Sequence, residues 1–291
     1  MSYTGRAIAE EVLSRGGAVR SLSRRDDPTD PLRGRIDVAP LRFDDSLVDS
    51  LRGASTLYNT YWIRFERGGH TFDEAVERSV MLFEAARRAG VERIVHVSVS
   101  SADRADDLPY FRGKHRIEDW LAASGLNYSV VRPTLVFGEN DILLNNIAWI
   151  LRRFPVFAIP GGGTYRVQPV SVQDTARICV DSRGEETIDA AGPETLTFRE
   201  LVEELRDAIG ARTRIVGAST SWTTPLTRLA GALLRDVIVT PDELSGLSRS
   251  LLTSSEEPRG SDRFGDWVRS QAATLGQSYV SELKRNFRRE K

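Results

Sequence analysis

The stretch that decides the fold is MSYTGRAIAEEVLSRGGAVRSLSRR, residues 1–25. Its first half repeats apolar residues at the spacing of one helix face, and the apolar run AVRSL (18–22) that follows is typical of a strand. A helix that leads into a strand is the second half of a β-α-β unit. We therefore look for a preceding strand ahead of Gly5.

Gly5 is placed as the last glycine of a phosphate-binding turn, in which backbone N–H groups at a helix N-terminus hold a pyrophosphate. Counting back three positions puts Ser2 at the middle of the turn, and counting back six leaves the sequence. We therefore expect the first strand of the sheet to be missing and the chain start to be truncated or wrong. An ordinary helix-capping turn is the alternative interpretation of SYTG.

Strand and helix patterns alternate along the first two-thirds of the chain. Strands are predicted at 18–22, 55–62, 92–100 and 126–138, and amphipathic helices at 72–90 and 110–125. The strands are continuously apolar, which favours a parallel sheet covered by helices on both faces. The prediction is an α/β fold, a Rossmann-type doubly wound parallel sheet over residues 1–190. Residues 191–291 are expected to form a smaller, mostly helical substrate region that ends in a helix at about 263–288.

The segment YFRGK (110–114) is the sharpest indication of chemistry. Tyr110 and Lys114 stand four residues apart on a predicted helix, hence on one face. A nearby ammonium lowers the pKa of a phenol, which then exchanges a proton with a carbonyl or carbinol at neutral pH. Ser98 and Ser100 end the strand just upstream, at the sheet edge where open α/β folds bind ligands. The same spacing also occurs on ordinary solvated helices.

These motifs resemble the short-chain dehydrogenase/reductase superfamily, on its extended or atypical side. The segments that carry the resemblance are SYTGRAIAEEVL, LYNTYW, VHVSVSSAD, YFRGK, VVRPTLVFGEND and QPVSVQDTAR. The stretch NNIAWILRRFPVFAIPGGG is similar to epimerase/dehydratase-like proteins and to the complex I accessory subunit with this fold.

The resemblance implies a domain that binds NAD(P) and a C-terminal region that closes over a substrate. Tyr110 would be the general base with Lys114 as its partner, and the serine would be Ser100 or Ser98. The implied cofactor contacts are Ser2, Gly5, Arg24, Arg25, Asn59, Lys114 and Pro133.

Arg24 and Arg25 favour NADP as the cofactor. They fall about twenty residues after the glycine turn, where NAD-specific sites place a carboxylate on the ribose. A guanidinium grips a 2′-phosphate through two N–H groups. NAD remains the alternative if Asp26 or Asp27 reaches the ribose instead.

Other segments allow two interpretations each. Asn59-Thr60-Tyr61-Trp62 replaces the small residues usual beside the cofactor, and would line a substrate pocket or crowd the nicotinamide. Asn145 and Asn146 would contact substrate or bond locally, and Arg152, Arg153 and Arg166 would bind a nucleotide diphosphate or form a solvated face. The apolar segment 225–239 would pack internally or bind a membrane surface or partner.

The amino-acid composition argues against several classes of function. The net charge of -1 lacks the basic excess of nucleic-acid binders. A single cysteine, Cys179, and three scattered histidines predict no disulfide, no metal site and a cytoplasmic location. No run is apolar for long enough to span a membrane, and no secretion leader opens the chain. A small-molecule substrate is expected, and a weak protein partner or homo-oligomer stays open.

Two functions follow from these observations. The first is an NAD(P)-dependent oxidoreductase or epimerase/dehydratase-like enzyme with a Ser/Tyr/Lys site for a small carbonyl, alcohol or sugar-type substrate. The second is a non-catalytic NAD(P)-binding protein with a structural, assembly or sensing role.

Overall fold

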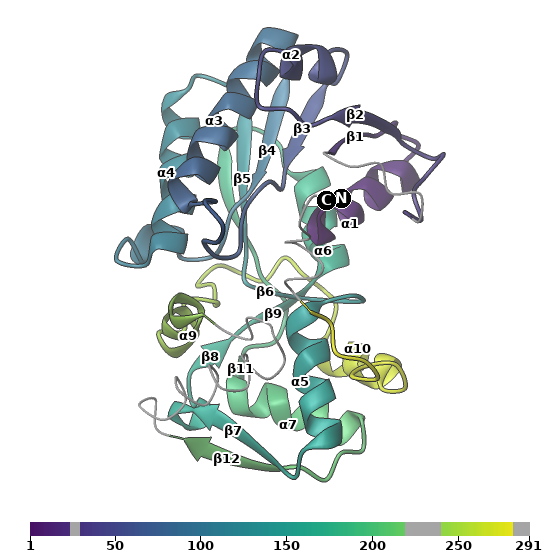
Figure 1. Ribbon diagram of the computed structural model, residues 1–291, viewed down its shortest axis with the longest axis vertical. Helices are drawn as coiled ribbons and strands as arrows, with labels where there is room; N and C mark the ends of the chain where they lie inside the picture. The colour runs from purple at the N-terminus through teal and green to yellow at the C-terminus, as the bar shows by residue number, and fades with distance from the viewer. Residues whose placement is uncertain (24–29, 219–239, 282–291) are drawn as a thin grey trace. The chain divides into compact units, whose positions relative to one another are not determined.

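The computed structural model describes residues 1–23, 30–218 and 240–281, in two compact units (Figure 1). Unit 1 comprises Met1–Pro133 and Val172–Ala190, and unit 2 comprises Thr134–Ser171 and Ala191–Lys291. Unit 1 ends at residue 190, and residues 134–171 belong with unit 2 because their strands pair there. The division into a cofactor domain (1–190) and a substrate region (191–291) stays a prediction.

Unit 1 is built on a parallel sheet with the strand order β10-β5-β4-β3. These strands are β3 (Thr56–Asn59), β4 (Arg93–Val97), β5 (Tyr128–Pro133) and β10 (Glu186–Ala190). Two further strands, β1 (Arg20–Ser23) and β2 (Asp37–Pro40), form a separate parallel pair. Within the described residues, β1 and β3 share no ladder. The α/β fold with parallel strands is confirmed.

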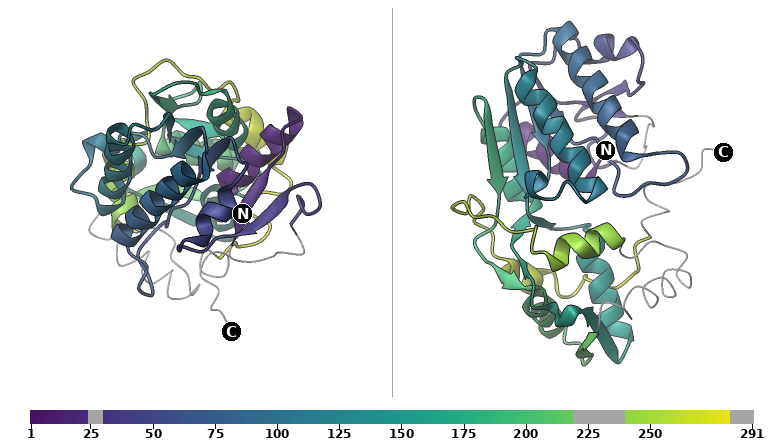
Figure 2. Two further views of the ribbon diagram at one scale, coloured as in Figure 1. Left: turned by 90° about the horizontal axis from the view of Figure 1, so that it is seen from above. Right: turned by 90° about the vertical axis from the view of Figure 1, so that its left-hand side faces the viewer.

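Helices cover both faces of this sheet. The helices of unit 1 are α1 (Tyr3–Ser14), α2 (Ser46–Leu51), α3 (Phe72–Ala89), α4 (Pro109–Ala123) and α6 (Val172–Asp181). Figures 1 and 2 show α3 and α4 side by side on one face, while α1 packs against α6 on the other. The Thr71 hydroxyl caps α3 by accepting from the Glu74 N–H at 3.1 Å, and Gly90 ends it at a φ of 78°. Buried Phe83, Ile94 and Ile117 form part of the core between helices and sheet.

Unit 2 mixes strands with helices. Its strands pair as β6 (Leu135–Phe137) with β9 (Pro169–Ser171), β7 (Val156–Pro160) with β12 (Arg214–Ala218), and β8 (Arg166–Val167) with β11 (Leu196–Thr197). Its helices are α5 (Ile142–Arg153), α7 (Phe198–Ala208), α9 (Pro241–Ser248) and α10 (Phe264–Gln271). Phe137, Leu201 and Phe264 lie in one apolar core. Among the described residues after 190, helices α7, α9 and α10 outweigh the strands, and the strand-like segment TRIVG corresponds to β12.

The helix predicted at 263–288 is shorter in the structure. Helix α10 ends at Gln271, and the chain beyond it bends at Gly276, where φ is 71°. A Cβ at Gly276 would stand 2.5 Å from the backbone of Ala148, so no side chain fits there. The prediction was wrong over 272–281 because contacts with α5 decide the backbone there.

Two asparagines of α5 hold this last segment by its backbone. The Asn146 amide donates to the Val280 carbonyl at 2.9 Å and accepts from the Val280 N–H at 3.0 Å. Asn145 donates to the Ser278 carbonyl at 2.9 Å and accepts from the Gly276 N–H at 3.0 Å.

The arginines at the end of α5 bind the same segment. Arg152 Nε donates to the Leu275 carbonyl at 2.8 Å, and Arg153 donates to the Gly276 carbonyl at 2.9 Å. Both arginines therefore bind the chain's own backbone, and Arg153 is exposed to solvent as well.

Some predictions fall outside the described residues. Arg24 and Arg25 lie there, as does the apolar segment 225–239. Over the ranges that the structure does describe, no helix combines the length and apolar character needed to cross a membrane.

Candidate cofactor and active site

Lys114 lies in the interior of unit 1, beside the C-terminal end of β4. It sits in the middle of α4 with 3% of its surface exposed, and its ammonium donates to the Val97 carbonyl at 2.8 Å. The ammonium also lies 4.7 Å from the centre of the Trp62 ring, a cation–π contact. Burial lowers the pKa of Lys114 from 10.5 to about 7, and the nearby Glu118 carboxylate acts in the opposite direction.

Tyr110 lies one turn before Lys114, in the first turn of α4. Its ring meets Trp62 edge-on at 5.9 Å between centroids and Phe72 at 5.8 Å. Trp62 and Phe72 in turn stack at 5.8 Å with an interplanar angle of 15°. The spacing read from YFRGK therefore places both residues against the same indole, Tyr110 at its edge and Lys114 over its face.

The two candidate serines have different surroundings. The Ser98 hydroxyl donates to the Glu118 carboxylate, and both residues are buried. Ser100 is fully buried, and its N–H donates to the carbonyl of Pro133 at 2.9 Å. Pro133 thus ends β5 next to the turn that carries Ser100. The hydroxyl of Ser98 is thus engaged by Glu118, and the choice between Ser98 and Ser100 as the serine of the site stays a prediction.

Glu118 connects this site to the neighbouring strand through an ion pair that the sequence analysis missed. Arg132 on β5 donates through Nε to both carboxylate oxygens of Glu118 at 3.1 Å and pairs with Asp103 at 3.3 Å. The side chains of Arg132 and Glu118 are 15% and 7% exposed, so this is a largely buried pair. Glu118 follows Lys114 by four residues, which is the one sequence signal that could have indicated it.

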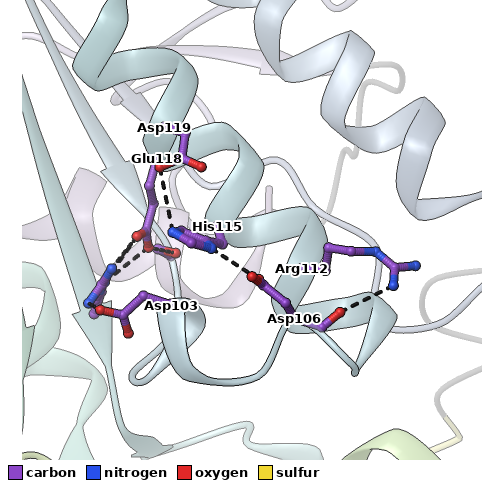
Figure 3. Close-up of polar contacts among 8 residues, drawn as sticks. Asp103, Asp106, Arg112, His115, Glu118 and Asp119 are labelled. Carbon is purple, nitrogen blue, oxygen red and sulfur yellow. Dashed lines mark hydrogen bonds and ion pairs between the residues drawn. The ribbon is translucent and has the colours of Figure 1, made fainter.

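A second, more exposed group lies on the outer side of α4. Figure 3 shows His115 between Asp106 and Asp119, and its Nδ1 lies 3.0 Å from an Asp106 oxygen. The hydrogen bond to Asp106 raises the pKa of His115. Glu118 and Asp103 form their ion pairs with Arg132, although the Glu118 charge also contributes to the raised pKa of His115. His115 is therefore a surface ion pair rather than part of the Lys114 site.

Asn59 uses both ends of its amide inside the protein. Its Nδ2 lies 3.0 Å from His96 Nδ1, and its Oδ1 accepts from the Tyr61 N–H at 3.0 Å. With Asn59 donating to Nδ1, the proton of neutral His96 sits on Nε2, which has no hydrogen-bond partner among the described residues. Burial and the charge of Lys114 lower the pKa of His96, so its ring is neutral.

The N-terminus of α1 forms the other part of the predicted cofactor site. Ser2 caps this helix, accepting from the Gly5 N–H at 3.0 Å, and its hydroxyl lies 2.7 Å from that of Thr60. A Cβ at Gly5 would stand 2.7 Å from Ser2 Oγ and 3.0 Å from Thr60 Oγ1. The turn therefore fits closely against the loop after β3, as a glycine turn at a phosphate site requires. The structure shows the capping role of SYTG, and its phosphate role stays a prediction.

The hydrogen-bond donors described above suit the polar groups of a dinucleotide. Backbone N–H groups at the start of α1 suit a pyrophosphate, and the ammonium of Lys114 suits the hydroxyls of a ribose. The composition supports a special role for Lys114, since the sequence holds only three lysines, the others being Lys284 and Lys291, among 40 basic residues.

Comparisons with known proteins agree with an NAD(P)-binding fold. Residues 2–146 match a family described as NAD(P)H-binding. The chain is 25% identical, over 71% of its length, to the mitochondrial NADH dehydrogenase [ubiquinone] 1 alpha subcomplex subunit 9 of Arabidopsis thaliana. It is 26% identical, over 70% of its length, to the NADH-ubiquinone oxidoreductase 40 kDa subunit of Neurospora crassa. The chain spans 56% and 55% of these two relatives, a little over half.

A solved structure shares the fold at lower identity. The triphenylmethane reductase of Citrobacter sp., complexed with NADP(H), superposes with a TM-score of 0.74 at 17% identity, covering 94% of this chain and 97% of that one. At this identity the likeness concerns the fold alone. Together these findings define an NAD(P)H-binding protein with a Rossmann-type fold. The match over residues 2–146 shows an NAD(P)H-binding domain, and the resemblance to the short-chain dehydrogenase/reductase superfamily agrees with it.

Proposed function

We propose that this protein is an NADP-dependent oxidoreductase that acts on a small carbonyl or alcohol. The observation that carries the proposal is the buried ammonium of Lys114, one helical turn from Tyr110 at the carboxyl end of a parallel strand. A buried cation is costly to keep, and perturbed groups of this kind concentrate at functional sites.

In this proposal each residue has a distinct role. Tyr110 passes its phenol proton to the carbonyl oxygen during reduction and takes it back during oxidation. Lys114 lowers the pKa of the phenol and holds the nicotinamide ribose, and Ser100 donates a hydrogen bond to the same carbonyl oxygen. NADPH, when bound, supplies the hydride. An epimerase or dehydratase would use the same residues and return the hydride to its substrate.

The preference for NADP rests on Arg24 and Arg25 and on the neighbouring folds. Guanidinium groups at the end of the second strand of the fold suit a 2′-phosphate. The Citrobacter reductase was solved with NADP(H), and the NADPH-dependent quinone oxidoreductase of Escherichia coli was solved with NADPH. NAD stays the alternative.

Binding and turnover measurements test the proposal. NADPH should bind more tightly than NADH, and Arg24→Ala should remove most of that difference. With a panel of aldehydes, ketones and quinones, Tyr110→Phe should abolish turnover while the NADPH dissociation constant changes less than about threefold, because the phenol contacts substrate rather than cofactor. Equal affinities in the unmutated protein would remove the NADP assignment.

A second candidate function is a dinucleotide-binding component without turnover. Trp62 lies over Lys114, which favours a site closed to chemistry, and the curated relatives are named as subunits of a respiratory complex. Tight NADPH binding with no turnover of any carbonyl, unchanged by Tyr110→Phe, would favour this role. A protein partner and the cytoplasmic location stay predictions in either case.

A further inference from the structure

Trp62 is packed onto the functional helix in a way that depends on a glycine. Its ring lies 4.7 Å from the Lys114 ammonium, and a Cβ at Gly113 would stand 2.8 Å from the indole Cη2. Glycine inside a helix costs about 0.5–1 kcal/mol relative to alanine, so its place at the middle of α4 needs a reason. The reason visible here is room for the indole directly beside Lys114.

The contact leaves hydrogen-bonding capacity unused. The Trp62 indole N–H is buried and has no acceptor within the residues that the structure describes. Across the same residues, the Val97 carbonyl is the single hydrogen-bond acceptor for the Lys114 ammonium, which has three protons to donate. Unused buried donors are rare and costly, and they mark a place that a ligand with acceptor oxygens would satisfy.

Trp62 lies on a connecting segment rather than on a helix or strand. It belongs to the connection between β3 and α3, residues 60–71, which follows the carboxyl end of a parallel strand. Its partners Phe72 and Tyr110 contact it through ring faces and edges, without a hydrogen bond to the indole. Rotation of the indole therefore breaks no hydrogen bond.

We propose that Trp62 controls access to Lys114: the indole covers the ammonium in the structure described here and must rotate away before a ligand with acceptor oxygens binds there. This inference rests on the proposed function, in which that ligand is the ribose end of NADPH. Trp62 acts as a positioning residue, because it decides the state of Lys114 and takes no part in proton transfer.

Chemical labelling of Lys114 tests the cover without any turnover. Acetylation by an N-hydroxysuccinimide ester is followed by mass spectrometry, with Lys284 and Lys291 in the same sample correcting for reagent. Trp62→Ala should label Lys114 about tenfold faster than the unmutated protein, the size expected for loss of a desolvated cation–π contact. Gly113→Ala should also speed labelling, because its methyl group displaces the indole while every aromatic residue is kept.

Trp120→Ala is the matched control. Trp120 lies on the same helix but contacts Phe83, at 5.7 Å between ring centres. It should leave Lys114 labelling unchanged. Equal acceleration by Trp120→Ala and Trp62→Ala would show general loosening and overturn the inference, as would unchanged labelling in both Trp62→Ala and Gly113→Ala.

Protection by the cofactor separates this inference from the proposed function. NADPH should slow labelling of Lys114 in Trp62→Ala and bind that variant about tenfold more tightly than the unmutated chain. Faster labelling in Trp62→Ala with no protection by NADPH or NADH would support the cover and refute the NADP-dependent function. If NADPH protected Lys114 in Trp62→Ala but bound that variant more weakly than the unmutated chain, Trp62 would be part of the binding surface. That result would refute the proposal that Trp62 covers Lys114.

Discussion

Replacing Lys114 by methionine should stabilise the protein. The side chain is 3% exposed, and burial lowers its pKa from 10.5 to about 7. Each pH unit of that difference corresponds to about 1.4 kcal/mol, so keeping the charged form buried costs about 5 kcal/mol at pH 6. Methionine has a similar length, no charge and a favourable contact with the Trp62 ring. Lys114→Met should therefore raise the free energy of unfolding by up to about 5 kcal/mol at pH 6.

The advantage of the variant should shrink as the pH rises. Between about 7 and 10.5 the unfolded chain keeps the lysine proton that the folded chain has lost, so the stability of the unmutated protein increases with pH in that window. Below about 7 both states are protonated and the full penalty applies. From pH 6 to pH 9 the difference between variant and unmutated protein should fall by about 2.5 kcal/mol.

Urea unfolding at the two pH values measures this difference, because titrations elsewhere in the chain cancel between the proteins. Arg116→Met is the control: this side chain is 49% exposed on the same helix, and its ion pair with Asp73 is worth at most about 1 kcal/mol. Its effect should not depend on pH over this range. If Lys114→Met left the free energy of unfolding unchanged, or raised it equally at pH 6 and pH 9, the claim that Lys114 is buried with a lowered pKa would be refuted.

Three further outcomes are expected. Glu118→Gln should destabilise the protein by about 3 kcal/mol in urea unfolding, because the largely buried Arg132 keeps Asp103 but loses the charge of its closer and more buried partner, whereas Asp119→Asn at an exposed position should cost less than about 0.5 kcal/mol. Tyr110→Phe should keep NADPH binding and lose carbonyl turnover in the assays described above. Asn146→Ala should speed hydrogen exchange of the Val280 N–H by about tenfold in mass spectrometry, since it removes that N–H's acceptor; unchanged exchange would show that the segment is held by other contacts.

Local periodicity predicted the central elements of the fold well. The pattern at 72–90 became α3 (Phe72–Ala89) because an amphipathic face and Gly90 determine both its burial and its end. The predicted helix beyond residue 271 failed for the opposite reason. There the backbone follows Asn145 and Asn146, more than 130 residues earlier in the chain, and no local pattern contains those contacts.

The sequence predicted those site residues that are close together along the chain. It did not predict contacts that depend on how a helix packs against the sheet. Tyr110 and Lys114 share a helix face by spacing alone. The pair between Glu118 and Arg132 depends on how α4 lies against β5, which the sequence does not reveal. Ser98 therefore looked equivalent to Ser100 until the structure joined its hydroxyl to Glu118.

The same reasoning explains why a lysine, rather than an arginine, stands at position 114 in a chain with so few lysines. A guanidinium cannot lose its proton in a protein, so an arginine there would be a permanent charge in the interior of unit 1. Lysine can be neutral or charged in this position, because burial lowers its pKa to about 7 and a ligand with acceptor oxygens would favour the charged form. Trp62 is one of the aromatic residues after Asn59 that the sequence left as either pocket lining or obstruction. Its contact with the Lys114 ammonium suits a lysine at this position.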